Sequence, residues 1–186
     1  MNQGQSFPLK KHLFLIGYRG SGKTSVAREL ARIYGCEQVD TDQLVEQKAG
    51  MPIREIFEVA GEERFRELET EELFDLVNRT PMIVSLGGGI VLRQENRRFL
   101  RAHGFSVWLQ ATPAILHERI QADESTQLQR PALSQLSGYD EIVHLLAKRE
   151  PLYSELADNI VQTENLSPDK VAKRIIEWID SFCKGS

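Results

Sequence analysis

Residues 17–24 read Gly17-Tyr18-Arg19-Gly20-Ser21-Gly22-Lys23-Thr24 and match the pattern G-x-x-x-x-G-K-[ST] at every fixed position. The apolar segment 12–16 precedes this loop, and a helical pattern follows it over 25–31. Glycines let the backbone curl so that successive N–H groups point inward at a polyphosphate. The following helix adds the positive end of its dipole. The order of strand, loop and helix therefore favours a phosphate-binding loop over a chance glycine-rich turn.

This loop predicts that the protein binds ATP together with Mg²⁺. Lys23 would reach the β- and γ-phosphates, and the hydroxyl of Thr24 would ligate the metal ion. The residues of this stretch that we expect to hold the nucleotide are Gly20, Ser21, Gly22, Lys23, Thr24 and Ser25.

Length and composition indicate an ordinary globular protein. The chain has 186 residues, of which 41% are hydrophobic and 27% charged, and we expect a single domain over residues 1–186. No apolar run approaches the roughly 20 residues that span a bilayer, and residues 1–8 lack the apolar part of a signal peptide. Cys36 and Cys183 have no metal-type spacing. We therefore expect a cytoplasmic protein without membrane contacts, and a monomer is the default expectation.

The net charge of −4 argues against a general nucleic-acid binder. One basic cluster is an exception, and its helical spacing favours a solvated helix face over a binding patch. Its members are Arg93, Arg97, Arg98 and Arg101. The predicted partners are therefore small molecules and not nucleic acid.

Five short apolar strands alternate with helical patterns along the chain. This alternation predicts an α/β protein in which helices cover both faces of a five-stranded parallel sheet, as three α/β/α layers. The expected strands are 12–16, 37–39, 81–86, 105–109 and 159–162. The expected helices are 22–34, 44–49, 53–60, 62–78 after a break at Gly61, 93–103, one starting at 112–113, 139–156 interrupted at Pro151, and one starting at 167–168. Between 122 and 137 the periodicity fails, which predicts a mobile loop.

Two carboxylates follow the second strand. If the strand continues, Asp40 and Asp42 project the same way, because side chains alternate along a strand. Such a pair beside Mg²⁺ and a nucleotide could hold the metal's water molecules and accept a proton from an attacking hydroxyl. A strand-end turn with Asp42 capping the next helix is an equally open interpretation.

Gly87, Gly88 and Gly89 follow the third strand. Three glycines suit the close approach of a ligand to the bare backbone, whereas a tight turn is the simpler alternative. Phosphate-loop enzymes often carry an Asp after this strand for the metal ion. Here the strand has no acid, so Asp40 becomes the candidate for that role and Ser85 could bond a metal-bound water.

Two arginines lie on predicted helices. Arg66 follows the inward Phe65, and its helical spacing from Glu62 and Glu69 also allows a simple surface ion pair. Arg149 stands two residues before a proline and could equally belong to a solvated bend.

Two further arginines lie nearer the irregular loop. Arg130 is inside it, where it could swing over the charge that develops during phosphoryl transfer or simply be solvated. Arg119 on the preceding helix is a candidate for stacking on adenine.

Taken together, these motifs resemble one family, shikimate kinase, from about His12 to Asp158. The matching segments, in order, are the phosphate loop 17–24, Val39-Asp40-Thr41-Asp42, the stretch 56–69 with Phe65-Arg66, Ser85-Leu86-Gly87-Gly88-Gly89, Arg130-Pro131-Ala132-Leu133, and Lys148-Arg149-Glu150-Pro151-Leu152-Tyr153. Many unrelated proteins share the phosphate loop, so the other segments carry the specificity.

The resemblance implies a phosphate-loop kinase fold with a lid at about 122–137 and substrate-binding helices at about 42–79. It implies ATP-dependent phosphorylation of the 3-hydroxyl of shikimate, on the route to chorismate and aromatic amino acids. The resemblance implies that Asp42 contacts the substrate hydroxyls as base or orienting group and that Arg66 and Arg149 bind the carboxylate. It implies that Gly88 contacts a hydroxyl through its backbone, with Gly87 and Gly89 also in the substrate site. Arg130 would meet the transferred phosphoryl group.

The same resemblance implies that Lys23 binds the phosphates and that Thr24 ligates the metal ion. It also implies that Asp40 contacts the metal ion through water and that Arg119 lies near adenine. Two features depart from the family pattern. The lid is long and rich in Gln and Ser, and the adenine-side residues are not recognisable at 163–165.

Three other functions fit parts of the sequence. A gluconate-type sugar-acid kinase shares the loop, although Arg66 and Arg149 favour a cyclic carboxylate as substrate. A nucleoside monophosphate kinase is less consistent with the triple glycine, which suits a hydroxyl substrate. A nucleotide-dependent regulatory domain without activity would require that a catalytic group be missing, and none is missing.

Overall fold

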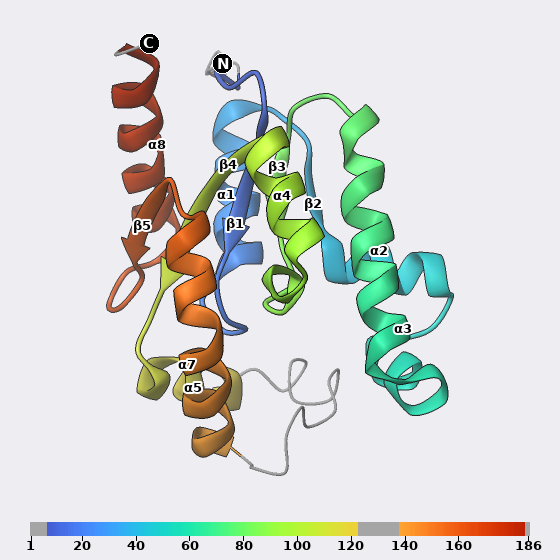
Figure 1. The fold of residues 1–186 in the computed structure, drawn as a ribbon. Helices are drawn as coiled ribbons and strands as arrows, with labels where there is room; N and C mark the ends of the chain where they lie inside the picture. The colour runs from blue at the N-terminus through green and yellow to red at the C-terminus, as the bar shows by residue number, and fades with distance from the viewer. Residues whose placement is uncertain (1–6, 123–137, 185–186) are drawn as a thin grey trace.

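A parallel sheet in the strand order β2-β3-β1-β4-β5 forms the centre of the protein (Figure 1). The structure is a computed structural model that describes residues 7–122 and 138–184. The strands are β1 (His12–Ile16), β2 (Gln38–Asp40), β3 (Ile83–Ser85), β4 (Gly104–Gln110) and β5 (Asn159–Gln162). All four pairings are parallel. The predicted sheet is therefore confirmed, with each strand shifted by at most a few residues.

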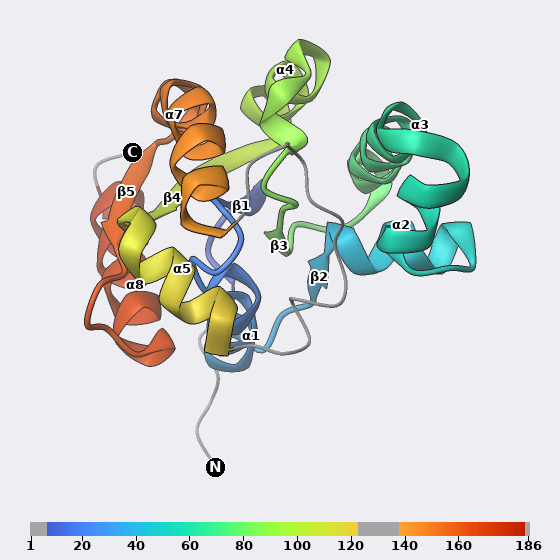
Figure 2. The same ribbon diagram turned by 90° about the horizontal axis from the view of Figure 1, so that it is seen from below.

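Helices cover both faces of the sheet, which gives the three predicted layers (Figure 2). Helices α1 (Lys23–Tyr34) and α8 (Pro168–Lys184) pack on one face, where Leu13, Leu15 and Val107 contribute to their core cluster. Helices α4 (Gln94–His103) and α7 (Gly138–Leu156) pack on the other face against Phe14 and Val84. The alternation of β1 side chains between the two clusters explains why this strand is apolar at almost every position.

Helices α2 (Thr41–Ala49) and α3 (Ile53–Asp75) stand apart from these layers, beyond the β2 edge of the sheet (Figure 1). They share a small hydrophobic cluster of their own, composed of Val45, Ile53, Ile56, Phe65 and Leu68. Lys48 on α2 also bridges to α3, 2.9 Å from Glu72 and 3.0 Å from Glu71. The two helices therefore form a distinct unit joined to the sheet.

Gly61 kinks α3 with φ 81° and ψ 172°, a conformation that side-chain-bearing residues rarely adopt. The predicted break at this glycine is confirmed, although the helix resumes at once. Two predictions about the helices were wrong. The helix expected over 62–78 ends earlier, at Asp75, and a 3-10 turn follows at Leu76–Asn78, which leaves Val77 47% exposed. Helix α7 runs through Pro151 without interruption, and a 3-10 turn at Ile90–Leu92 was not expected.

The carboxyl ends of the three central strands meet at one edge of the sheet. Ser85 of β3 is in register with Leu15 of β1 on one side and with Asp40 of β2 on the other. The loops that follow these strands therefore lie side by side, where ligands of open α/β sheets bind. Helix α5 (Pro113–Ala122) follows β4 at the same end. Within residues 7–122 and 138–184, no helix combines the length and the apolar character needed to cross a membrane.

Candidate active site

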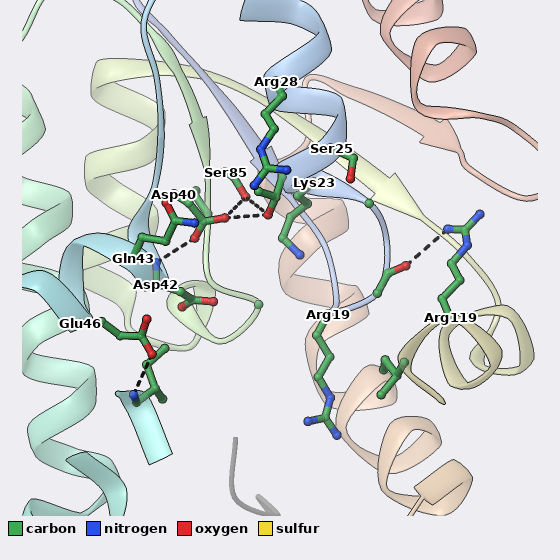
Figure 3. A pocket seen from close by; sticks show the side chains of 17 residues that line it. Arg19, Lys23, Ser25, Arg28, Asp40, Asp42, Gln43, Glu46, Ser85 and Arg119 are labelled. Atoms are coloured by element: carbon green, nitrogen blue, oxygen red, sulfur yellow. Dashed lines mark hydrogen bonds between the residues drawn. The ribbon is translucent and has the colours of Figure 1, made fainter. Parts of the chain in front are cut away.

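A cavity of about 580 Å³ opens at this edge of the sheet (Figure 3). Figure 3 shows Asp40, Asp42 and Glu46 on one side of it, and Arg19 and Arg119 on the other. The full lining consists of Arg19, Gly20, Gly22, Lys23, Thr24, Ser25, Arg28, Asp40, Asp42, Gln43, Glu46, Ile53, Ser85, Leu86, Gly88, Arg119 and Ile120. The cavity therefore brings together the phosphate loop, the two aspartates and one residue of the triple glycine.

The phosphate loop has the curled backbone that its sequence predicts. Gly20 and Gly22 take φ angles of 80° and 91°, and the helix α1 begins directly after them at Lys23. The ammonium group of Lys23 donates hydrogen bonds to the carbonyls of Gly17 and Tyr18, both at 2.9 Å. The lysine thus lies inside the loop, beside the position where phosphate oxygens would enter.

Three side chains converge where the first helix meets β2 and β3. The hydroxyls of Thr24 and Ser85 donate to the same carboxylate oxygen, Oδ2 of Asp40, at 2.7 Å and 2.9 Å. These are oxygen groups of the kind that Mg²⁺ binds directly or through water. No group of three His, Cys, Asp or Glu side chains suited to a metal occurs in the described part of the chain. The residues present fit a hydrated Mg²⁺ that also needs nucleotide phosphates, and they do not form a closed protein cage.

The expected relation between Asp40 and Asp42 was wrong in two respects. The strand β2 ends at Asp40 and α2 begins at Thr41, so the two side chains do not alternate along one strand. Asp40, and not Asp42, caps the helix, because its Oδ1 accepts from the backbone N–H of Asp42 at 3.0 Å. Because of this cap, Asp42 lies in the first turn of α2, and the two carboxylates occupy different positions in the cavity.

The triple glycine lies against charged side chains on two sides. A Cβ atom on Gly87 would collide with Oε1 of Glu69 and Oδ1 of Asp42, and one on Gly89 would overlap the guanidinium of Arg66. The backbone N–H of Gly87 donates to the Thr41 hydroxyl at 2.9 Å. Glycine is therefore required here for close approach, which goes beyond what a simple turn needs.

The next two peptide groups have unmet hydrogen-bonding capacity. Gly88 and Gly89 are both buried, and within the described residues their N–H groups have no acceptor. A buried backbone donor without a partner is costly, so native structures usually supply one. These two N–H groups are accordingly available to a ligand.

Arg66 forms the predicted ion pairs, but they are not on the surface. The guanidinium is only 6% exposed, and it contacts the fully buried carboxylate of Glu69 and, at 3.0 Å, that of Glu62. Burial raises the pKa of Glu69, whereas the positive charges of Arg66 and Arg149 act in the opposite direction. A paired, buried arginine beside Gly89 is held in place to present its remaining donors.

Arg149 is also buried, with 5% exposure, although it was open to the interpretation of a solvated bend. Its guanidinium lies 5.5 Å from the centre of the Tyr18 ring, in the phosphate loop. One turn further along α7, the hydroxyl of Tyr153 donates to the carbonyl of Gly88. The helix α7 therefore touches both the phosphate loop and the triple glycine.

Arg119 lies at the far end of the cavity and is held by several backbone groups. It donates to the carbonyl of Gly20 at 3.4 Å and to the carbonyl of Thr163 at 2.7 Å. The structure thus brings 163–165, where no adenine contacts were recognised, next to Arg119. Arg130 and the predicted lid residues 123–137 lie outside the described residues.

Sequence reasoning missed several residues of the site. Arg28, Gln43 and Glu46 line the cavity but belong to no motif that was singled out, and Arg19 lies at a variable position of the phosphate loop to which no role was assigned. Glu46 is fixed by accepting a hydrogen bond from the N–H of Ile53 at the start of α3. Glu69 could have been found from its spacing three residues after Arg66, which was interpreted only as an ion pair.

Comparisons with known proteins agree with this geometry. A family model described as Shikimate kinase matches residues 19–180. The shikimate kinase of Histophilus somni is 38% identical over 174 residues, which cover 93% of this chain and 97% of that protein. The chain belongs to the shikimate kinase family. The resemblance that the motifs indicated is confirmed, and the protein is a kinase.

Solved structures of the shikimate kinase family have the same fold. The shikimate kinase from Acinetobacter baumannii, solved in complex with shikimate, superposes with a TM-score of 0.86 at 33% identity and covers 92% of this chain and 93% of that one. A gluconokinase from Sinorhizobium meliloti gives a TM-score of 0.62 at 16% identity, over 95% of each chain. The second likeness shows a common fold alone.

Proposed function

We propose that this protein transfers the γ-phosphoryl group of ATP to the 3-hydroxyl of shikimate, giving shikimate 3-phosphate and ADP in the biosynthesis of chorismate and aromatic amino acids. Membership of the shikimate kinase family supports this reaction. One structural observation carries it further. The buried Arg66 lies against a glycine loop that has two N–H groups without an acceptor among the described residues, and the buried Arg149 lies against the Tyr18 ring of the phosphate loop.

The acceptor half of the site suits a rigid polyhydroxy carboxylate. Arg66 and Arg149 supply planar guanidinium groups, which bind a carboxylate through two parallel hydrogen bonds. The N–H groups of Gly88 and Gly89 can donate to a substrate hydroxyl, and Glu69 Oε1, which has no hydrogen-bond partner among the described residues, can accept from one. A linear sugar acid would leave part of this fixed constellation unused.

The donor half binds the nucleotide through the loop and a metal ion. Lys23 and the backbone of Gly20, Ser21 and Gly22 surround the β- and γ-phosphates. Thr24 would ligate Mg²⁺, and Asp40 and Ser85 would hold its water molecules. When bound, the metal ion neutralises charge on the phosphate oxygens. Ser25 and Arg119 complete the nucleotide contacts, and Arg130 meets the transferred group.

Asp42 is the group that deals with the acceptor's proton. It projects from the first turn of α2 toward Gly87, on the side of the cavity opposite Arg19. The 3-hydroxyl oxygen forms a bond to the γ-phosphorus while the bond from that phosphorus to the bridging oxygen of ADP breaks. The hydroxyl proton passes to Asp42, which acts as base or at least orients the attacking oxygen.

The test is ADP release measured with shikimate, quinate, gluconate and AMP as acceptors. We expect turnover with shikimate and little with the other three. Turnover with gluconate or AMP but not with shikimate would overturn the proposal. ATP binding without turnover of any acceptor would instead support a regulatory domain.

The variant Asp42→Asn tests the role of the carboxylate. We expect turnover to fall by about 10²-fold or more, the usual contribution of a positioned base, while ATP affinity stays near that of the unchanged protein. Asp180→Asn, at an exposed position of α8, is the matched control and should keep full activity. Unchanged turnover in Asp42→Asn would remove Asp42 from the mechanism.

We also propose that the enzyme is a cytoplasmic monomer that binds neither membranes nor nucleic acid. The net charge of −4 supports the absence of a nucleic-acid partner. Light scattering combined with size-exclusion chromatography tests the oligomeric state, and a mass near twice 21.2 kDa would contradict a monomer.

A further inference from the structure

Helix α7 presents three side chains to the site, spaced eight and four residues apart. Glu141 bonds Arg19 of the phosphate loop at 2.9 Å. Arg149 lies against the Tyr18 ring, and Tyr153 reaches Gly88. Residues four apart on a helix share one face. The row therefore runs along a single face of α7, from the donor half of the site to the acceptor half.

We propose that Tyr153 is a positioning residue that sets the orientation of the Gly88–Gly89 peptide and its distance from Arg149. The proposal rests on the proposed function, because it assigns Arg149 to the substrate carboxylate and the glycine N–H groups to a substrate hydroxyl. Tyr153 acts through this peptide group, because its hydroxyl donates to the Gly88 carbonyl.

The first argument is the geometry of the peptide group. The Tyr153 hydroxyl donates to the Gly88 carbonyl at 2.5 Å. In a planar trans peptide the carbonyl and the following N–H point in opposite directions. Fixing the Gly88 carbonyl toward Tyr153 therefore directs the Gly89 N–H away from Tyr153.

The second argument is that glycine needs such an anchor. Three successive glycines leave the loop unusually free to rotate, because no side chain restricts the backbone. Gly88 also lies close to the phosphate loop, because a Cβ atom placed on Gly88 would be 3.2 Å from the carbonyl oxygen of Gly17. The hydroxyl of Tyr153 is thus the side-chain group that holds the Gly88 carbonyl among the described residues.

The third argument is that Tyr153 is itself immobile. Its side chain is fully buried, and its ring lies 5.7 Å from that of Trp108 on β4. Arg149 stands one helical turn before it. A rigid helix therefore carries both the arginine for the carboxylate and the anchor for the hydroxyl-binding loop, and so fixes the spacing between two ends of one substrate.

Tyr153→Phe removes only the hydroxyl and keeps the ring against Trp108. We expect the shikimate KM to rise about fivefold to tenfold, which is the effect of losing one well-placed hydrogen bond, while the ATP KM changes less than about twofold. Tyr34→Phe is the matched control. It removes an equally buried hydroxyl, without a partner among the described residues, from the core on the opposite face of the sheet.

The kinetic outcome separates positioning from general loosening. Unchanged KM values in Tyr153→Phe would overturn the proposal, and so would an equal rise of both KM values or the same rise in Tyr34→Phe. A merely structural role predicts one of these results.

A second measurement needs no substrate and keeps the two proposals separable. Hydrogen–deuterium exchange at the N–H groups of residues 86–92 should be faster in Tyr153→Phe than in the unchanged protein, and unaltered in Tyr34→Phe. Equal exchange in all three proteins would overturn the role of Tyr153. If the unchanged protein did not phosphorylate shikimate, the proposed function would fail, while the exchange result would still decide whether Tyr153 anchors the loop.

Discussion

The guanidinium of Arg149 lies 5.5 Å from the centre of the Tyr18 ring, so a residue of the phosphate loop supports an arginine that we propose for the acceptor site. Tyr18 occupies one of the variable positions of the loop motif and is almost fully buried. A cation over an aromatic face is attracted to it, and burial strengthens this attraction. The donor and acceptor halves are therefore in direct contact through these two side chains.

Replacing the ring tests this contact. Tyr18→Leu should raise the shikimate KM about threefold to tenfold, because a desolvated cation–π interaction contributes roughly 1 kcal/mol. Tyr18→Phe keeps the aromatic face and should behave like the unchanged protein. Steady-state kinetics with varied shikimate at saturating ATP provides the measurement, and equal KM values in the two variants would show that the ring face is irrelevant.

Arg66→Lys should raise the shikimate KM about tenfold or more and lower kcat less. An ammonium cannot form the two parallel hydrogen bonds of a guanidinium to a carboxylate, and the lost interaction is with the bound substrate. Arg64→Lys is the control on the same helix, since Arg64 makes only an exposed pair with Glu67 and Glu71. A fall in kcat at constant KM would argue against carboxylate binding by Arg66.

Asp40→Asn should increase the Mg²⁺ concentration for half-maximal activity about tenfold, a usual effect of removing a residue that holds a metal's ligands in place. Ser85→Ala should also increase this Mg²⁺ concentration, but by less, because the substitution removes a neutral group. Both follow from the hydrogen bonds that Thr24 and Ser85 make to Asp40. The measurement is enzyme activity at increasing Mg²⁺ concentration and fixed ATP concentration. Identical curves for Asp40→Asn and the unchanged protein would exclude Asp40 from the metal site.

His12 should make the fold less stable in acid. Burial lowers its pKa, although the carbonyl of Leu76 partly counteracts this. A lowered pKa in the folded state means that the unfolded chain takes up the proton first. The contribution of His12 to the free energy of unfolding is therefore complete above about pH 6.5, the pKa of histidine in the unfolded chain. This contribution is lost as the pH falls below that value.

Urea unfolding at pH 7.5, 6.5 and 5.5 measures this effect. The free energy of unfolding should fall more between the last two values in the unchanged protein than in His12→Gln, which has no group that titrates there. His144→Gln, at an exposed position of α7, should retain the full pH dependence. Parallel pH profiles for all three proteins would contradict the assignment to His12.

The sequence allowed the sheet, the phosphate loop and the family to be predicted because these depend on local patterns. Strand periodicity, glycine spacing and helix starts are all encoded within a few neighbouring residues. The position of Asp42 could not be predicted in this way. A hydrogen bond from its N–H to Asp40 caps a helix that begins at Thr41, three residues before the expected start, and this changes the direction of the side chain.

Relations between distant segments were also beyond local patterns. The burial of Arg66 and Arg149 results from packing of α3 and α7 around the triple glycine, and an isolated arginine resembles any solvated one. The contacts of Tyr153 with Gly88 and of Arg149 with Tyr18 join residues more than sixty positions apart. Only the folded chain brings such pairs together.

The separate hydrophobic cluster of α2 and α3 has an evolutionary consequence. Val45, Ile53, Ile56, Phe65 and Leu68 pack mainly with one another, apart from the two clusters that stabilise the sheet. Mutations within this cluster therefore leave intact the two clusters that stabilise the sheet and its phosphate loop. This independence gives a lineage of kinases a physical route to acquire new acceptors while the machinery for ATP is inherited unchanged.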